Sequence, residues 1–409
     1  MSLKKDLQRY VFAAFGPMAV SLVHFAASLL LLRLLAPQDF GIYAFMMVAV
    51  QFGFSLSNAL AGTPFTVKRN QTDFFPDDEL PFFRVSLLIA LGWALSCAIA
   101  AMLLGPAAAA LPIAVWALLA IIRWFCRSYF YALHKPGRAV LSDAAYAATL
   151  LAGLAWFWMY PAGLPAVFTA FSVAAAAGLA TAGPHFITRQ FAALATRGQG
   201  SYVQVWRDQS RWTLLGVAST EATTNAHAWL VTLLAGPAAF APLAASALLF
   251  RPTGLCATSL TQLERPVMAR ALSRGDRPAA LRAMRHFRFA MLAVWAGTAT
   301  LAFSVLFWTP SLIVREGYDM RQIMIAAALW AAVTFLQAWR VADSTLLQAA
   351  SRFRPLATAS LWSGTATLAA VMTLLLFLDP VLSLLGVLAG QLVLAWRIKR
   401  LFQMWRQHE

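Results

Sequence analysis

The chain of 409 residues is too apolar for a water-soluble globular protein, because 61% of its residues are hydrophobic and only 12% are charged. Its net charge of +16 comes from basic residues scattered along the chain, which excludes the single basic domain typical of a nucleic-acid-binding protein. The three cysteines lie in apolar stretches without metal-binding spacing, so the sequence predicts neither a disulfide framework nor a metal site.

Twelve apolar stretches, each about as long as a membrane-spanning helix, follow one another along the chain. A hydrocarbon core roughly 30 Å thick requires about 20 helical residues. The first stretch is too long for the apolar region of a cleaved signal peptide, so we interpret it as a retained helix. The predicted spans are residues 10–33, 41–66, 82–104, 106–133, 138–160, 163–187, 212–235, 238–262, 287–309, 322–348, 354–377 and 380–398.

The distribution of basic residues sets the orientation of these spans. Of the 32 Lys and Arg residues, 27 fall in or beside alternate gaps between the spans. Arg33, Arg315 and Arg321 mark the opposite face, and Arg251 and Arg340 lie inside spans. Because short loops rich in Lys and Arg stay in the cytoplasm, we expect both termini on the cytoplasmic side.

A polar segment, residues 191–211, divides the chain into an N-terminal lobe, 1–190, and a C-terminal lobe, 212–409. Residues 34–44 and 234–244 share Leu, Pro, Phe and Ala at four positions that are 200 residues apart. We therefore predict an all-α membrane protein with two six-helix lobes related by a pseudo-two-fold axis along the membrane normal. Transporters of this plan bind their substrate between the lobes near mid-bilayer, and the lobes rock to give alternating access.

Three arginines in the predicted spans are candidate substrate-binding residues: Arg123, Arg251 and Arg340. A charge at the centre of a spanning helix costs about 2.5–3.5 kcal/mol unless it faces a cavity or a partner. Guanidinium groups converging on a cavity would suit a phosphate group. Structural pairing is the alternative for Arg123 and Arg340, and an ion pair with Glu221 is the alternative for Arg251. Pro252 predicts irregular, cavity-facing backbone at Arg251.

The seventh span is unusually polar, and Glu221, Asn225 and His227 are its candidate functional residues. Polar side chains in a span face water or another helix, so Glu221 is either a proton or sodium coupling site or part of a helix contact. Asp343, one turn from Arg340, is the expected ion-pair partner of that arginine. The sequence contains no P-loop, dinucleotide-binding motif or nucleophile elbow, and it predicts neither an enzyme nor a cofactor site.

The hairpin between the first two spans carries a resemblance to a known family. Residues 31–43 read Leu-Leu-Arg-Leu-Leu-Ala-Pro-Gln-Asp-Phe-Gly-Ile-Tyr. This sequence resembles the first hairpin of Wzx-type polysaccharide flippases, which belong to the multidrug/oligosaccharidyl-lipid/polysaccharide exporter (MOP) superfamily. Ala36 stands where those proteins usually have glycine. The match at Arg33 and at Phe40 and Gly41 implies a structural turn.

The resemblance implies a fold like that of the multidrug and toxic compound extrusion (MATE) transporters and a cationic cavity. It also implies movement of an undecaprenyl-diphosphate-linked oligosaccharide from the inner to the outer leaflet of the bacterial cytoplasmic membrane, for O-antigen, capsule or exopolysaccharide synthesis. The implied partners are this lipid-linked oligosaccharide, membrane lipids, and the polysaccharide polymerase and chain-length machinery.

Two other kinds of transporter stay open as alternatives. A multidrug cation exporter of the same fold would favour buried acids, whereas arginines predominate in the predicted spans. A major-facilitator transporter also has twelve spans, but its usual loop motif is absent from residues 66–73, Thr-Val-Lys-Arg-Asn-Gln-Thr-Asp. A scaffolding membrane protein is a third reading, against which the embedded arginines argue.

Overall fold

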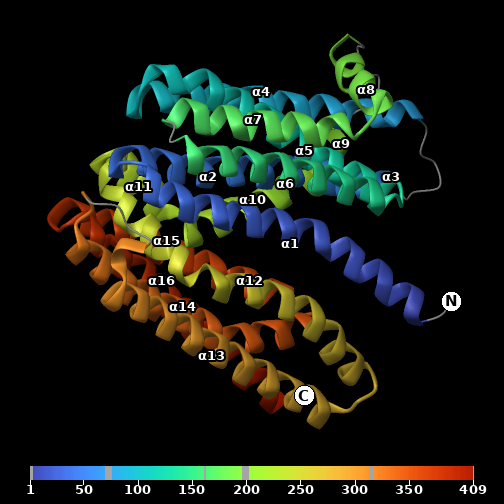
Figure 1. Ribbon diagram of the computed structural model, residues 1–409. Helices are drawn as coiled ribbons and strands as arrows, with labels where there is room; N and C mark the ends of the chain where they lie inside the picture. The colour runs from blue at the N-terminus through green and yellow to red at the C-terminus, as the bar shows by residue number, and fades with distance from the viewer. Residues whose placement is uncertain (1–2, 70–75, 161–162, 196–201, 313–316, 409) are drawn as a thin grey trace. The chain divides into compact units, whose positions relative to one another are not determined.

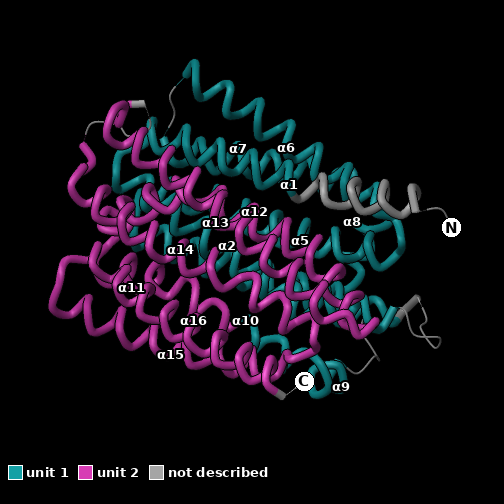
Figure 2. The backbone as a smooth tube through the Cα atoms, turned by 90° about the horizontal axis from the view of Figure 1, so that it is seen from below, with its two compact units in different colours: residues 1–217 teal, residues 218–409 magenta. Residues whose placement is uncertain are grey.

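The computed structural model describes residues 3–69, 76–160, 163–195, 202–312 and 317–408, and within these ranges it is helical without a β-strand (Figure 1). The chain forms two compact units, residues 1–217 and 218–409 (Figure 2). Arg197 in the predicted linker and Arg315 on the predicted outer face lie outside the described residues.

The first unit contains long helices joined by short connections. Pro37 opens α2 at its first position, where the missing N–H of proline needs no helical partner. The helices are α1 (Leu3–Leu34), α2 (Pro37–Ser57), α3 (Thr63–Arg69), α4 (Leu80–Leu104), α5 (Ala110–Ala132), α6 (Pro136–Met159), α7 (Leu164–Ala180), α8 (Pro184–Ala195) and α9 (Tyr202–Val205). The short helical segments are the π-helices η1 (Asn58–Gly62) and η4 (Trp206–Ser210) and the 3-10 helices η2 (Pro76–Glu79) and η3 (Ala107–Ala109).

Helix α10 (Arg211–Thr224) begins in the first unit and ends in the second. The helices that follow are α11 (Ala226–Ala235), α12 (Pro237–Ser273), α13 (Arg277–Trp308), α14 (Met320–Ala349), α15 (Phe353–Phe377) and α16 (Ser383–His408), with the turns η5 (Pro310–Leu312) and η6 (Pro380–Leu382). Within this unit α12, α13 and α14 pack against one another, as do α15 and α16.

Nine helical runs in the described part of the chain are long and apolar enough to cross a membrane. They correspond to the second to fifth and the eighth to twelfth predicted spans. The other three predicted spans fall on a shorter apolar helix, Met18–Leu34, on the bent pair α7 and α8, and on the interrupted pair α10 and α11. The all-helical, membrane-spanning fold class is confirmed, and the count of twelve stays a prediction.

The sixth predicted span, 163–187, differs from the structure because the chain turns after α7. Helix α7 ends at Ala180, and α8 leaves at 106° to it. Gly183 has a φ of +85°, a conformation that glycine adopts without steric cost. Pro184 then begins α8. The last residues of the predicted span therefore belong to a separate helix.

The predicted irregular backbone at Arg251 and Pro252 is wrong, since α12 is helical from Pro237 to Ser273. An internal proline removes one backbone hydrogen bond, and a helix packed among neighbouring helices tolerates this loss. The helix also continues past the predicted end of its span. Arg265 and Arg270, which the sequence placed in a loop, are therefore helical.

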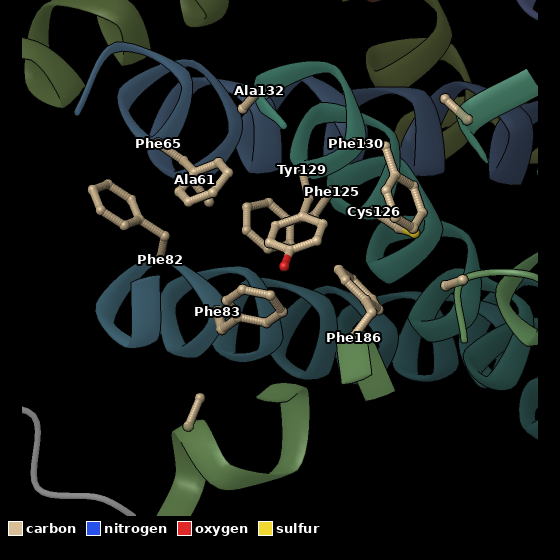
Figure 3. Packing of buried hydrophobic residues seen from close by; sticks show 13 residues of the cluster. Ala61, Phe65, Phe82, Phe83, Phe125, Cys126, Tyr129, Phe130, Ala132 and Phe186 are labelled. Carbon is tan, nitrogen blue, oxygen red and sulfur yellow. The ribbon is translucent and has the colours of Figure 1, made fainter. Parts of the chain in front are cut away.

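Aromatic side chains fill the core where α3, α4, α5 and α8 meet (Figure 3). The ring of Phe83 lies 5.2 Å from the rings of both Phe125 and Phe186, and Phe65 stacks on Tyr129 at 5.6 Å. Such pairs are worth about 0.5–1.5 kcal/mol beyond the burial of their area. Phe186 thus fixes α8 against α4 and α5.

Candidate functional site

A polar cleft with a volume of about 400 Å³ lies between α12 and α14, wholly within the second unit. Its lining residues recur every three or four positions on each helix, so each helix presents one polar face. The residues are Ala257, Thr258, Thr261, Gln262 and Arg265 of α12, and Arg340, Val341, Ser344, Thr345 and Gln348 of α14.

Arg340, one of the three arginines predicted from the sequence, lies in this cleft. Its Nη2 donates a hydrogen bond to Oε1 of Gln391 on α16 at 3.0 Å. Its Nε is buried without a hydrogen-bond partner, and no carboxylate of the described residues forms an ion pair with it. The cleft therefore contains a positive charge that the described residues do not neutralise.

Arg265 provides a second guanidinium in the cleft, and its Nη1 donates to Oε1 of Gln348 at 3.3 Å. Gln348 follows Arg340 by eight residues on α14, about 12 Å at the helical rise. The sequence counted Arg265 among loop residues and missed it as a site residue. The signal that could have found it is the helical repeat of Thr258, Thr261 and Arg265 on one face.

The cleft is lined by cationic, hydroxyl and amide groups, and no carboxylate is among its lining residues. Guanidinium groups bind phosphate oxygens with paired, charge-assisted hydrogen bonds. Hydroxyl and amide side chains both donate and accept hydrogen bonds. The cleft can therefore hold an anion together with neighbouring hydroxyl groups.

The predicted ion pair between Arg340 and Asp343 is not formed. Asp343 is buried and pairs instead with Arg288 of α13, whose guanidinium also lies 5.2 Å from the ring centre of Trp339. Asp343 faces α13, whereas Arg340 faces the cleft and α16. The carboxylate is consequently tied to a neighbouring helix and leaves the charge of Arg340 uncompensated.

Arg123 belongs to the first unit and is buried in an ion-pair cluster. Its Nη1 lies 2.7 Å from Oδ1 of Asp143, and Nε of Arg127 lies 3.3 Å from Oδ2 of the same carboxylate. The guanidinium of Arg123 also lies 4.3 Å from the ring centre of Tyr146. These contacts correspond to the structural pairing that the sequence left open for Arg123. Arg127 lies one helical turn from Arg123, and this spacing is the signal that could have indicated a carboxylate shared by the two arginines.

Glu221, Asn225 and His227 lie where α10 gives way to α11. The Glu221 carboxylate accepts hydrogen bonds from Nδ2 of Asn225 at 3.0 Å and from Nε1 of Trp229 at 2.8 Å. The ion pair between Glu221 and Arg251 stays a prediction. His227 is buried, with its ring 5.3 Å from that of Trp330.

Arg251 is a partly exposed residue of α12 and is not among the lining residues of the cleft. Of the three predicted arginines, the cleft thus contains Arg340 only. No group of three or more His, Cys, Asp and Glu side chains that could hold a metal ion occurs in the described ranges.

No protein-family model and no curated protein matches the sequence. Solved structures do match. An inward-facing multidrug resistance MATE family transporter of the MOP superfamily matches with a TM-score of 0.65 and 13% identity, over 98% of this chain and 99% of that chain. The lipid II flippase MurJ in an inward closed conformation matches with a TM-score of 0.66 and 11% identity, over 95% and 87%.

A third match is a MOP superfamily transporter from Pyrococcus furiosus, whose description says that the reversed polarity of its binding pocket suggests a different function. It has a TM-score of 0.59 and 11% identity, over 96% of this chain and 93% of that chain. At these identities the similarity is one of fold. The chain accordingly has the fold that is common to the matched MATE family transporter and the lipid II flippase MurJ.

Proposed function

We propose that the protein is a flippase that moves an undecaprenyl-diphosphate-linked oligosaccharide from the cytoplasmic to the outer leaflet, by alternating access, for surface polysaccharide synthesis. The observation that carries this proposal is the α12–α14 cleft, which has two guanidinium groups and no lining carboxylate. The membrane is the bacterial cytoplasmic membrane with both termini inside, and the polymerase and chain-length machinery would use the product.

The chemistry of such a substrate explains why this cleft would be needed. A diphosphate and a glycan lose many hydrogen bonds to water on entering hydrocarbon, and an isolated charge is the costliest group to bury. Arg340 and Arg265 would compensate the phosphate charges, and the hydroxyl and amide side chains would replace water around the sugar. The polyprenyl tail needs no such compensation and would stay in lipid.

The fold similarity supports the proposal. MurJ is described as a lipid II flippase, and it matches along nearly the whole of this chain. The multidrug transporter matches to a similar extent, so the fold alone does not select the substrate. The selection rests on the positive charge of Arg340 and Arg265 in the cleft.

The test is leaflet-specific labelling of lipid-linked sugar after depletion of the protein and re-expression of variants. The double variant Arg265→Gln, Arg340→Gln should insert normally and leave the lipid-linked sugar on the cytoplasmic leaflet. The matched control Arg282→Gln, Arg285→Gln removes two exposed charges from α13, outside the cleft, and should restore the wild-type distribution. An unchanged leaflet distribution after depletion would overturn the proposal.

A multidrug or small-solute secondary exporter is the second candidate, favoured by the carboxylate of Glu221 at the break between α10 and α11. In this candidate the carboxylate would bind the coupling proton or sodium ion. Cells producing the protein would then show raised resistance to cationic drugs, and Glu221→Gln would abolish it. Unchanged drug resistance together with retention of lipid-linked sugar on depletion would exclude this candidate.

A further inference from the structure

A second groove, with a volume of about 320 Å³, lies between the basic ends of α15 and α16 and is separate from the α12–α14 cleft. Both helices belong to the second unit. Two of the lining residues are arginines and most of the others are apolar. The groove is lined by Pro355, Thr358 and Ala359 of α15 and by Trp396, Arg397, Arg400, Leu401 and Met404 of α16.

The groove arises where two closely packed helices separate. Near the middle of the pair a Cβ atom on Gly390 would lie 1.9 Å from Oγ1 of Thr367, and Oγ of Ser363 donates to the carbonyl of Gly390 at 2.8 Å. The backbones therefore approach closely there. Toward the basic end, the small side chains of Pro355 and Ala359 leave space beside α16.

The two arginines of the groove, which both belong to α16, have no acidic counterpart on α15 or α16. Neither α15 nor α16 contains an Asp or Glu residue. Among the described residues, no carboxylate forms an ion pair with Arg397 or Arg400. The groove thus presents two uncompensated positive charges next to an apolar wall.

Tryptophan side chains hold both guanidinium groups in place. The guanidinium of Arg397 lies 4.8 Å from the ring centre of Trp362, and that of Arg400 lies 4.0 Å from the ring centre of Trp396. The two tryptophans are 54% and 50% exposed. Exposed tryptophan is enriched at the level of lipid headgroups, and stacking on an aromatic ring reduces the mobility of a guanidinium. The stacking therefore orders both arginines, and the exposed tryptophans favour a position of the groove near the boundary between lipid and water.

We propose that this groove is a binding site for the phosphate headgroup of an anionic glycerophospholipid. Arg397 and Arg400 would bind the phosphate oxygens, and the first acyl carbons would lie along Leu401 and Met404. A lipid is favoured over a soluble anion because most lining residues besides the two arginines are apolar and because exposed tryptophans are typical of the membrane interface. A volume of about 320 Å³ is sufficient for a phosphoglycerol headgroup.

The experiment is native mass spectrometry of the full chain extracted from equal mixtures of phosphatidylglycerol and phosphatidylcholine. The double variant Arg397→Gln, Arg400→Gln should retain phosphatidylglycerol about a hundred-fold more weakly, since it removes two direct charge-assisted contacts to the phosphate and each contributes roughly a ten-fold change in affinity. The control Arg354→Gln, Arg406→Gln removes two charges from the same end of the same helices, outside the groove. It should retain the lipid nearly as the wild type does.

Two further measurements separate the groove from general charge attraction. Thr358→Phe fills the groove at an exposed position without changing its charge, and it should lower retention of phosphatidylglycerol as well. Inorganic phosphate at millimolar concentration should not displace the lipid. Equal losses in the groove and control pairs, unchanged retention with Thr358→Phe, or displacement by inorganic phosphate would each overturn the lipid site.

Discussion

Arg340 on α14 donates a hydrogen bond to Gln391 on α16 at 3.0 Å, and this bond orients the positive charge of the α12–α14 cleft. Gln391 is 2% exposed, so the amide is a buried, neutral acceptor. A neutral acceptor positions the guanidinium without cancelling its charge. The positive charge of Arg340 therefore remains in the cleft, because the residue that α16 places beside it is the neutral Gln391.

Replacing this acceptor by a carboxylate should neutralise the cleft. Gln391→Glu would form an ion pair with Arg340, and we expect lipid-linked sugar to stay on the cytoplasmic leaflet although the protein remains folded. Gln391→Met removes the hydrogen bond and keeps the charge, so it should lower stability by about 1.5–3 kcal/mol but allow transport. Leaflet labelling and thermal unfolding measure the two effects. Transport by Gln391→Glu at the wild-type rate would contradict the role of the charge.

Asp143 should be the most sensitive polar position of the first unit. Asp143→Asn would leave the buried guanidinium groups of Arg123 and Arg127 without a negative partner. The expected loss is about 3–5 kcal/mol in the free energy of unfolding. Thermal unfolding of purified protein is the measurement. Arg127→Gln preserves the ion pair between Arg123 and Asp143 and should cost less, and the opposite order would show that Asp143 does not organise the cluster.

The turn between α7 and α8 should depend on glycine at position 183. Because Gly183 has a φ of +85°, Gly183→Ala forces a side chain into a left-handed conformation that costs about 1–2 kcal/mol. Gly137 is the matched position, since it lies in the first turn of α6 with nothing within 4 Å of an added Cβ. Gly137→Ala should leave the unfolding temperature unchanged or raise it. Equal effects of the two substitutions would contradict the argument.

The titration of Glu79, which directly precedes the first residue of α4, should make the free energy of unfolding depend on pH. Burial raises the pKa of its carboxyl above the ordinary value of 4.5, and the charges of Arg189, Arg69 and His185 oppose this rise. A raised pKa means that the folded state favours the protonated acid. The contribution of the protonated Glu79 carboxyl to the stability of the folded state is present below pH 4.5 and is lost as the pH rises through the folded-state pKa.

Glu79→Gln removes this titration. We expect the unfolding temperature of the variant, relative to wild type, to increase between pH 4 and pH 7. If the difference in unfolding temperature between Glu79→Gln and the wild type stays constant with pH, this result would contradict the raised pKa.

Local composition predicted the fold class because hydropathy and helix length are local properties. The second span illustrates this, since it was predicted over residues 41–66 and lies within the helical run Pro37–Arg69. Side-chain partners depend on which face each helix presents, and here the prediction failed. Asp343 pairs with Arg288 rather than with Arg340. For Arg123 the sequence left cavity lining and structural pairing open, and the structure shows the pairing, with Asp143 on α6. Arg265 was missed because α12 continues beyond the apolar part of its span.

The length of α12 gives the cleft a direction across the membrane. A helix of 37 residues extends about 56 Å, nearly twice the hydrocarbon thickness, so part of it stands among lipid headgroups or in water. Arg265 is in the last third of this helix, near its basic end, whereas Arg340 lies about two turns further from that end. An anionic headgroup resting at the membrane surface would meet Arg265 first and Arg340 next. The two arginines would then act as successive binding positions on a path from the membrane surface into the bilayer.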